Sequence, residues 1–346
     1  MVKIGILGAT GYAGIELVRI LSQHPQVEIV SVTSQSYAGQ KISDIYPHLR
    51  GLCDMTCEKP DVEKISRQCD LVFTALPHGV SKTIVPQLAA HNLKVIDLSG
   101  DFRYNDTTVY EKWYGTPHTD PALLEKAVYG LPELHRAQIA KASLIGNPGC
   151  YTTCSILPLV PLLANQMIHR DNIIIDAKSG VSGAGRSTAL PYHFCECTEN
   201  MKAYKIAAHR HTSEIEQELS EVAGEQMMLS FTPHLVPMKR GIITTAYANL
   251  KQKCTTASLL DMYKQYYQDE YFIRIHPEGK LPETKYVAGS NFIDIGMVVD
   301  ERLNRVVVVA ALDNIIKGAA GQAVQNMNIL LGIDEKTGLA APGMYI

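Results

Sequence analysis

One cysteine in the sequence lies in a setting that favours a nucleophile. Cys150 follows the turn sequence Asn-Pro-Gly at 147–149 and comes just before a helical pattern over Tyr151–Ala164. At a helix N-terminus, unpaired N–H groups and the positive end of the helix dipole stabilise a thiolate. A thiolate is the nucleophile of acyl transfer, so we predict that Cys150 forms a covalent acyl intermediate. Cys154, about one turn further on, is expected to face the core.

Acid–base chemistry beside such a cysteine favours histidine, which titrates near neutral pH. Of the 12 histidines, His209 and His211 flank Arg210 and precede a helical pattern that Thr212 or Ser213 could cap. Side chains two residues apart in an extended segment point in opposite directions. We therefore expect one of the two histidines to face the cysteine.

A glycine-rich loop near the start of the chain predicts a dinucleotide-binding site. The loop lies between an expected strand at Lys3–Ala9 and an expected helix at Gly11–Gln23, with the spacing GxxGxxG. Glycines let the backbone approach a pyrophosphate, which binds at the helix N-terminus. The residues expected to contact the cofactor here are Gly8, Thr10, Gly11, Tyr12, Ala13 and Gly14.

The end of the second expected strand favours NADP(H) over NAD(H). An NAD site typically places a carboxylate there for the ribose 2′-hydroxyl, whereas this chain has Ser34, Gln35 and Ser36. Hydroxyl and amide groups can accept a 2′-phosphate that a carboxylate would repel. A nucleophilic cysteine beside a nicotinamide then implies hydride transfer between nicotinamide C4 and the acyl carbon of a cysteine thioester or thiohemiacetal.

Two fold patterns follow each other along the chain. The first third alternates strands with helices, which predicts a parallel sheet; the expected strands are Lys3–Ala9, Glu28–Ser34, Leu71–Pro77 and Lys94–Gly100, with a helix at 80–91. From about Asn172 strand-like segments dominate, namely Asn172–Ser182, Met228–Leu250, Phe272–His276, Phe292–Val299 and Arg305–Leu312. A last helix at Ile316–Leu331 is apolar enough to pack back on the first domain.

The sequence therefore predicts an α/β Rossmann dinucleotide-binding domain followed by an α+β domain on a mostly antiparallel sheet. We expect residues 1–147 and 315–346 to form the NADP-binding domain. Residues 148–314 are expected to form the catalytic and dimerisation domain. A length of 346 residues suits two such domains.

Composition excludes several classes of protein. The chain has 32 basic and 35 acidic residues, and its net charge of −3 does not indicate binding to nucleic acid or to an anionic membrane. The longest uncharged stretch is broken by prolines, so no membrane span is expected. No secretory signal is visible, which predicts reduced cysteines and a cytoplasmic protein. The Cys195 and Cys197 pair lacks the CxxC spacing of zinc sites, so no metal is expected.

Taken together, the motifs make the chain resemble the N-acetyl-γ-glutamyl-phosphate reductases over essentially its whole length. The matching segments are GATGYAGIEL at 8–17, YPHLRG at 46–51, ALPHG at 75–79, DLSGDFR at 97–103, YGLPEL at 129–134, GNPGCYTT at 146–153, SGVSGAGR at 179–186, HRHTSEIEQ at 209–217, PHLVPMKRGI at 233–242 and DNIIKGAAGQAVQNMN at 313–328. The glycine loop is shared with the wider semialdehyde dehydrogenase superfamily.

The resemblance implies a glyceraldehyde-3-phosphate-dehydrogenase-like fold and a reaction in arginine biosynthesis. NADPH would reduce N-acetyl-L-glutamyl 5-phosphate, through a Cys150 thioester, to N-acetyl-L-glutamate 5-semialdehyde and phosphate. His209 would be the acid–base group, with His211 second. Gln35 stands where members of the family commonly have arginine. A homodimer or homotetramer is also implied.

The remaining site residues follow from the same motifs. Residues expected to contact the cofactor are Leu76, Pro77, Ser182, Gly183 and Asn314. The substrate is a small acyl phosphate with a carboxylate, and guanidinium groups suit both anions. The residues expected to bind it are Arg103, Asn147, Arg186, Lys239 and Arg240.

Three other functions remain open at this point. Aspartate-semialdehyde dehydrogenases share the chemistry, as would a reductase of an aminoadipyl phosphate. The segments HRHTSEIEQ and PHLVPMKRGI favour the N-acetylglutamyl substrate over both. A protein that senses NADP without catalysis would need no thiolate.

Overall fold

The computed structural model describes residues 1–345, which form two compact units. Unit one consists of Met1–Gly149 and Ala319–Ala340, and unit two contains Cys150–Gly318. The sequence predicted boundaries after residues 147 and 314, and the structure places them a few residues later, after Gly149 and after Gly318. Within the described residues, no helix is both long and apolar enough to cross a membrane.

Residues 341–345 belong to unit two, although the sequence predicted that 315–346 joins the first domain; residue 346 of that prediction lies outside the described residues. The backbone N–H of Met344 donates to the carbonyl oxygen of Ala288 at 2.8 Å. The ring of Tyr345 stacks on Tyr286, with centroids 5.9 Å apart. This segment has no periodic apolar pattern, so a main-chain hydrogen bond and one aromatic stack decide where it lies.

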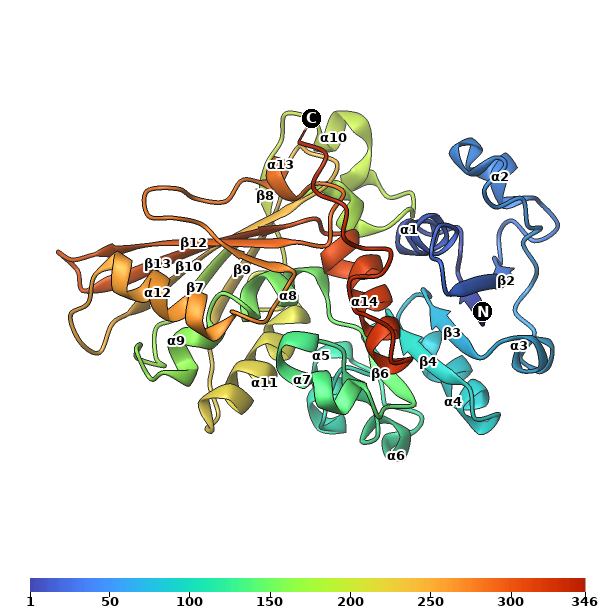
Figure 1. Cartoon of the computed structure of the whole chain (residues 1–346), viewed down its shortest axis with the longest axis horizontal. Helices are drawn as coiled ribbons and strands as arrows, with labels where there is room; N and C mark the ends of the chain where they lie inside the picture. Colours follow the sequence, from blue (N-terminus) through green and yellow to red (C-terminus); the bar gives the residue numbers. More distant parts are fainter. Residues whose placement is uncertain (346) are drawn as a thin grey trace. The chain divides into compact units, whose positions relative to one another are not determined.

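Unit one is built on a parallel sheet of six strands in the order β2-β1-β3-β4-β6-β5 (Figure 1). The strands are β1 Val2–Leu7, β2 Val27–Thr33, β3 Leu71–Thr74, β4 Lys94–Asp97, β5 Val128–Tyr129 and β6 Leu144–Gly146. The helices are α1 Tyr12–Leu21, α2 Ile42–Ile45, α3 Val62–Gln68, α4 Ser81–Ala90, α5 Thr107–Tyr114, α6 Pro121–Leu124, α7 Pro132–Ile139 and α14 Gly321–Leu330, with a 3₁₀ turn at Pro47–Leu49. Strand order changes direction at β1 and β3, which is where open α/β sheets bind ligands.

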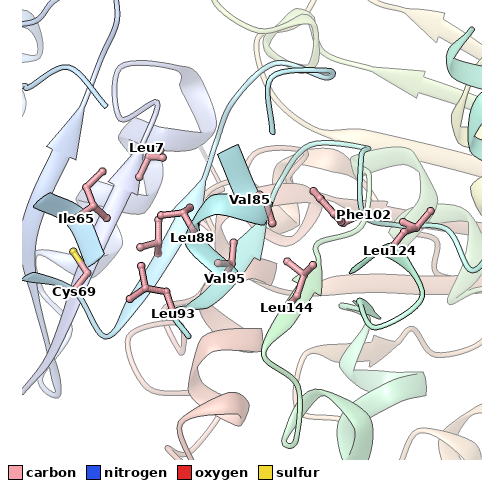
Figure 2. Close-up of a cluster of buried hydrophobic side chains, with 11 residues drawn as sticks. Leu7, Ile65, Cys69, Val85, Leu88, Leu93, Val95, Phe102, Leu124 and Leu144 are labelled. Carbon is pink, nitrogen blue, oxygen red and sulfur yellow. The ribbon is translucent and has the colours of Figure 1, made fainter. Parts of the chain in front are cut away.

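Apolar side chains from strands and helices hold this sheet in place (Figure 2). Leu7 and Val95 from β1 and β4 pack with Val85 and Leu88 of α4, and all four are fully buried. Helix α3 adds Ile65 to the same cluster. Because the helices cover the strands, the strand sequences are continuous apolar runs and do not alternate between apolar and polar residues.

The C-terminal helix α14 completes unit one through polar contacts. Asn326 donates from Nδ2 to the carbonyl oxygen of Gly130 at 2.8 Å and to Oδ1 of Asn147 at 3.0 Å. Asn147 in turn donates to the carbonyl oxygen of Ala319 at 3.1 Å. The sequence predicted one helix over Ile316–Leu331, but its first turn, Ile316–Ala320, is a π-helical turn.

Unit two is built on a mixed sheet of seven strands in the order β11-β12-β13-β10-β7-β9-β8. The pairs β7/β9 and β11/β12 are parallel and the other four adjacent pairs are antiparallel, so the sheet is mostly antiparallel as expected. The strands are β7 Ile174–Ser179, β8 Lys202–Ala203, β9 Ser230–Leu235, β10 Ile242–Asn249, β11 Ile273–Ile275, β12 Ile293–Asp300 and β13 Arg305–Leu312.

One face of this second sheet is covered by helices (Figure 1). The helices of unit two are α8 Cys150–Ile156, α9 Val160–Ala164, α10 Phe194–Cys197, α11 His211–Ala223, α12 Thr256–Tyr266 and α13 Thr284–Val287, with 3₁₀ turns at Val181–Ala184 and Leu190–Tyr192. Every second residue of β10 is buried, as a strand with one covered face requires. The predicted helical pattern over Tyr151–Ala164 is two helices, because Pro158 and Pro161 lack the N–H groups that a continuous helix needs.

Three strand ends meet at one edge of the second sheet. Ile242, the first residue of β10, pairs with Ser179 at the end of β7 and with Leu312 at the end of β13. The loops 180–186, 236–241 and 313–318 therefore leave the sheet side by side. Five of the residues predicted to bind cofactor or substrate in this unit lie in the first two loops, and Asn314 lies in the third.

Candidate active site

Cys150 is the first residue of α8 and is half-buried, as the sequence predicted. The backbone of Gly318 lies directly against it, since a Cβ at Gly318 would come within 2.8 Å of the Cys150 Cβ. Cys154 is fully buried as expected, and burial raises the pKa of its thiol to about 12. Of these two cysteines on α8, only Cys150 is therefore partly exposed.

An aromatic cluster surrounds the predicted acid–base residues. The ring of Tyr151, the residue after Cys150, meets the rings of His209 and His211 edge-on, at centroid distances of 5.7 and 6.0 Å. Tyr204 and Phe231 contact His209 in the same way, at 5.6 and 5.7 Å. The structure thus brings both histidines to the residue next to Cys150, and which of them acts there stays a prediction.

The protonation state of His209 follows from its surroundings. Its Nδ1 accepts a hydrogen bond from the backbone N–H of His211, the first residue of α11, at 3.1 Å. Burial, together with the charges of Lys205 and Arg210, lowers the pKa of His209 to about 4. At neutral pH the ring is therefore uncharged and carries its proton on Nε2, the nitrogen that can donate to a reacting group.

The two tyrosines of the cluster are held as neutral hydroxyls. Tyr151 donates to the carbonyl oxygen of His234 at 2.9 Å, and Tyr204 donates to the Tyr151 hydroxyl at 3.5 Å. Burial raises the pKa of Tyr204 to about 12 and raises that of Tyr151 as well. Neither is a charged partner for His209, so the cluster favours the neutral imidazole.

A buried hydrogen bond ties the helix of the cysteine to the helix of the histidines. Thr152 on α8 donates to a carboxylate oxygen of Glu214 on α11 at 2.9 Å, and both residues are fully buried. Glu214 lies in the first turn of α11, where a negative charge is stabilised by the helix dipole. This bond fixes the start of α11, and with it His211, relative to the first turn of α8.

Asn314 joins two of the loops at the sheet edge. Its Oδ1 accepts from the backbone N–H of Gly241 at 2.6 Å, and its Nδ2 donates to the Ser182 hydroxyl at 3.0 Å. Gly183 lies close by, since a Cβ there would come within 3.5 Å of Asn314 Nδ2. The three predicted cofactor residues of this unit therefore form one group, and their contact with a cofactor stays a prediction.

The predicted anion-binding residues of unit two differ in their surroundings. Arg240 is partly exposed and donates to the buried carboxylate of Asp313 at 3.3 Å. Lys239 and Arg186 are exposed in the neighbouring loops. Arg240 is thus tied to a buried carboxylate.

In unit one, the glycine loop has the shape that a pyrophosphate requires. Gly8 has φ +80°, and a Cβ there would overlap the carbonyl oxygen of Ala75. A Cβ at Gly14 would overlap the carbonyl oxygen of Gly8, whereas a Cβ at Gly11 would make an ordinary contact with that oxygen, at 3.5 Å. Gly11 caps α1 without a side chain, and the first turn of this helix contains no acidic residue among those described. The loop therefore fits a dinucleotide phosphate.

The other predicted cofactor residues of unit one follow the carboxyl ends of the same strands. Ser34, after β2, is buried and shares a hydrogen bond of 2.8 Å with the Thr10 hydroxyl. This bond ties the glycine loop to the end of β2. Gln35 and Ser36 are exposed there, as is Tyr12 on α1; Ala13, Leu76 and Pro77 are partly or fully exposed near the same edge.

The two predicted substrate residues of unit one are both buried. Arg103 donates from Nη2 to the carbonyl oxygen of Leu98 at 3.0 Å. Asn147 uses its side-chain amide to join Ala319 and Asn326. The structure gives these residues a role within unit one, and contact with a substrate stays a prediction.

Sequence reasoning missed several residues that build the site. Asp313 is the clearest case, because a single acidic residue after the apolar run of β13 was a visible signal. Tyr151 was also visible as the neighbour of Cys150. Tyr204 and Glu214 gave no signal, since their roles depend on how β8 and α11 pack.

Comparisons with known proteins cover both units. A family model described as semialdehyde dehydrogenase, NAD binding domain, matches residues 3–142, and one described as semialdehyde dehydrogenase, dimerisation domain, matches residues 150–314. The solved structure of aspartate semialdehyde dehydrogenase II from Vibrio cholerae, complexed with ASA, has a TM-score of 0.74 at 18% identity and covers 96% of this chain and 98% of that one. The Candida albicans enzyme with NADP has a TM-score of 0.73 at 19% identity, with the same coverage.

The chain belongs to the semialdehyde dehydrogenase family. Within it, the chain is 60% identical over 346 residues to the N-acetyl-gamma-glutamyl-phosphate reductase of Acetivibrio thermocellus, with all of both chains covered. It is 54% identical over 344 residues to the enzyme of the same name from Pelotomaculum thermopropionicum, with 99% of each covered.

The low pKa of His209 predicts a pH-dependent contribution to stability. The folded protein takes up this proton near pH 4, whereas the unfolded chain does so near the ordinary value of 6.5. Stability is therefore full above pH 6.5 and falls as the pH drops toward 4, because protons favour the unfolded chain. The urea midpoint should fall between about pH 7 and about pH 5, and fall less in His209→Asn.

Asparagine is a suitable replacement because its Oδ1 can accept the His211 N–H in place of Nδ1. The pKa values of His24 and His118 are also lowered by burial. Both residues are present in the wild type and in His209→Asn, so their effects cancel when the two urea midpoints are compared. An equal fall in the two midpoints would show that His209 is not held neutral.

Proposed function

We propose that this protein is an NADPH-dependent reductase that converts N-acetyl-L-glutamyl 5-phosphate to N-acetyl-L-glutamate 5-semialdehyde and phosphate, a step of arginine biosynthesis. The observation that carries the proposal is the half-buried Cys150 at the start of α8, followed by Tyr151, whose ring contacts His209, a histidine with a pKa lowered to about 4. Full-length relatives at 60% and 54% identity are named for the same reaction.

Cys150 is the nucleophile of this reaction. Its thiolate attacks the acyl carbon of the acyl phosphate, the bond from that carbon to the phosphate oxygen breaks, and inorganic phosphate leaves with the bonding electrons. The product of this step is a thioester on Cys150. NADPH, when bound, supplies the hydride that brings the thioester to the aldehyde level, after which the sulfur leaves as thiolate.

His209 is the acid–base residue. Its Nε2–H donates to the oxygen of the reacting carbonyl, where negative charge develops as the thiolate attacks. Its Nδ1 is held by the His211 backbone N–H, which fixes both the tautomer and the ring orientation. A neutral donor of this kind is present from about pH 5 upward, so it is ready at the pH of the cell.

The cofactor is NADP(H), bound by unit one. Gly8, Gly11 and Gly14 would receive the pyrophosphate at the start of α1, and the exposed Gln35 and Ser36 would receive the 2′-phosphate. The absence of a carboxylate at the end of β2 supports NADP over NAD.

The protein works as a homodimer or homotetramer in the cytoplasm. A match to a domain described as a dimerisation domain supports the assembly. All eight cysteines lie within the described residues and none of them is in a disulfide, which supports a reducing compartment.

The substrate can be tested by running the reaction in reverse with NADP⁺ and phosphate. N-acetylglutamate 5-semialdehyde should give NADPH at a rate well above that with aspartate semialdehyde or with an N-acetylaminoadipate semialdehyde. Activity with aspartate semialdehyde alone would refute the proposed substrate.

In the same assay, Cys150→Ser should lower kcat by at least about a thousandfold while NADPH still binds.

Cys254→Ser is the matched control, because Cys254 is also partly exposed but lies outside the site. It should retain the full rate. Turnover that survives in Cys150→Ser would exclude Cys150 as the nucleophile, and an unaltered NADPH titration would show that the variant is folded.

The two histidines can be separated by kinetics. His209→Asn should lower kcat about a hundredfold to ten-thousandfold, the usual contribution of a general acid–base group, and His211→Asn should lower it much less. Single-turnover rates at several pH values measure the chemical step directly. If only His211→Asn slows that step, the roles of the two residues are the reverse of those proposed.

A further inference from the structure

Asp313 is a fully buried carboxylate that no part of the reaction above uses. It follows the last residue of β13 and accepts hydrogen bonds at both oxygens. Its Oδ1 accepts from the backbone N–H groups of Ile315 and Ile316 at 2.8 and 3.1 Å, and its Oδ2 accepts from the N–H of Gly289 at 2.7 Å. A carboxylate is stable in such a place only when it is paired with a cation and hydrogen-bonded.

The cation is Arg240. Its Nη1 donates to Asp313 Oδ2 at 3.3 Å, and 31% of its side chain is exposed although its partner is 0% exposed. The guanidinium is therefore tied to a buried charge while part of the Arg240 side chain reaches the surface. Guanidinium presents its N–H donors in a planar fork that matches a carboxylate or a phosphate. A fork already held in place loses less conformational freedom when it binds an anion.

The same turn also reaches the nucleophile. The backbone carbonyl of Asp313 accepts from the N–H of Gly318 at 3.0 Å, and Gly318 lies against Cys150. Asn314, the next residue, holds the backbone of Gly241 beside Arg240. One short segment after β13 thus fixes both the Arg240 side chain and the main chain that contacts Cys150.

We propose that Asp313 is a positioning residue, whose carboxylate orients the Arg240 guanidinium to hold an anionic pair of oxygens on the substrate. This inference rests on the proposed function, which supplies a substrate with two such groups, a carboxylate and a phosphate. Asp313 itself touches neither the substrate nor the cofactor. It acts by fixing the direction of Arg240.

The test is steady-state kinetics of Asp313→Asn in the reverse direction, with separate KM values for phosphate and for N-acetylglutamate semialdehyde. One of the two KM values should rise at least about tenfold, because the charge that orients Arg240 is gone, and kcat should change less. A rise for phosphate identifies the phosphate as the anion held by Arg240, and a rise for the semialdehyde identifies the carboxylate. The KM for NADP⁺ should stay the same.

Asp294→Asn is the matched control for the loss of a buried ion pair. Asp294 lies on β12 of the same sheet, is 1% exposed, and accepts from Arg274 Nε at 2.5 Å. Its substitution should cost comparable stability without changing either KM. If Asp313→Asn shifts the KM values no more than Asp294→Asn does, Asp313 has a structural role only and the inference is overturned.

A second variant covers the case in which Asp313→Asn does not fold. Arg240→Lys leaves a cation near the Asp313 carboxylate, which keeps its three backbone N–H donors, but the planar fork of the guanidinium is lost. The KM for phosphate or the KM for the semialdehyde should therefore rise. An unchanged KM in Arg240→Lys would overturn the inference. Where both single variants fold, Asp313→Asn should add little to that KM in the Arg240→Lys background, and fully additive effects would contradict action through Arg240.

The wild-type protein separates this inference from the function on which it rests. If the wild type turns over the semialdehyde with phosphate and NADP⁺, the function holds and the variants decide the role of Asp313. If it does not, the proposed function fails, and the inference fails with it.

Discussion

The register of three strands is the constraint on which the site in unit two depends. Ser179, Ile242 and Leu312 are paired across β7, β10 and β13, so three loops leave the sheet at one edge. A shift of one residue would turn every side chain of β10 to the other face and separate these loops. The buried side chains of Asp313 and Asn314 then join the loops, and the helix α8 brings Cys150 to the turn that they form.

Burial gives the two cysteines of α8 different chemistry and keeps His209 neutral. On α8, Cys154 faces the sheet, which raises the pKa of its thiol to about 12, whereas Cys150 at the helix start stays partly accessible. His209 packs against aromatic rings and is held at Nδ1, which keeps it neutral with its proton on Nε2. Packing, rather than residue type, thus leaves one of the two cysteines partly accessible and favours one tautomer of the His209 imidazole.

The sequence was sufficient for features that depend on local pattern. The strand–glycine loop–helix unit, the turn before Cys150 and the change from a parallel to a mostly antiparallel sheet all follow from spacing and turn chemistry. It was not sufficient where packing decides. Two prolines divided the helical pattern after Cys150, and Tyr345 joined the second unit through a ring stack. Asp313, Tyr204 and Glu214 gain their roles only when distant segments meet.

The proposed reaction passes through a thioester on Cys150. Mass spectrometry of the protein incubated with N-acetylglutamate 5-semialdehyde and NADP⁺ without phosphate tests for this thioester. We expect an N-acetylglutamyl group on the peptide that contains Cys150, formed together with NADPH and removed when phosphate is added. An acyl group on another residue, or NADPH formation with phosphate but no acyl group on Cys150 in its absence, would contradict it.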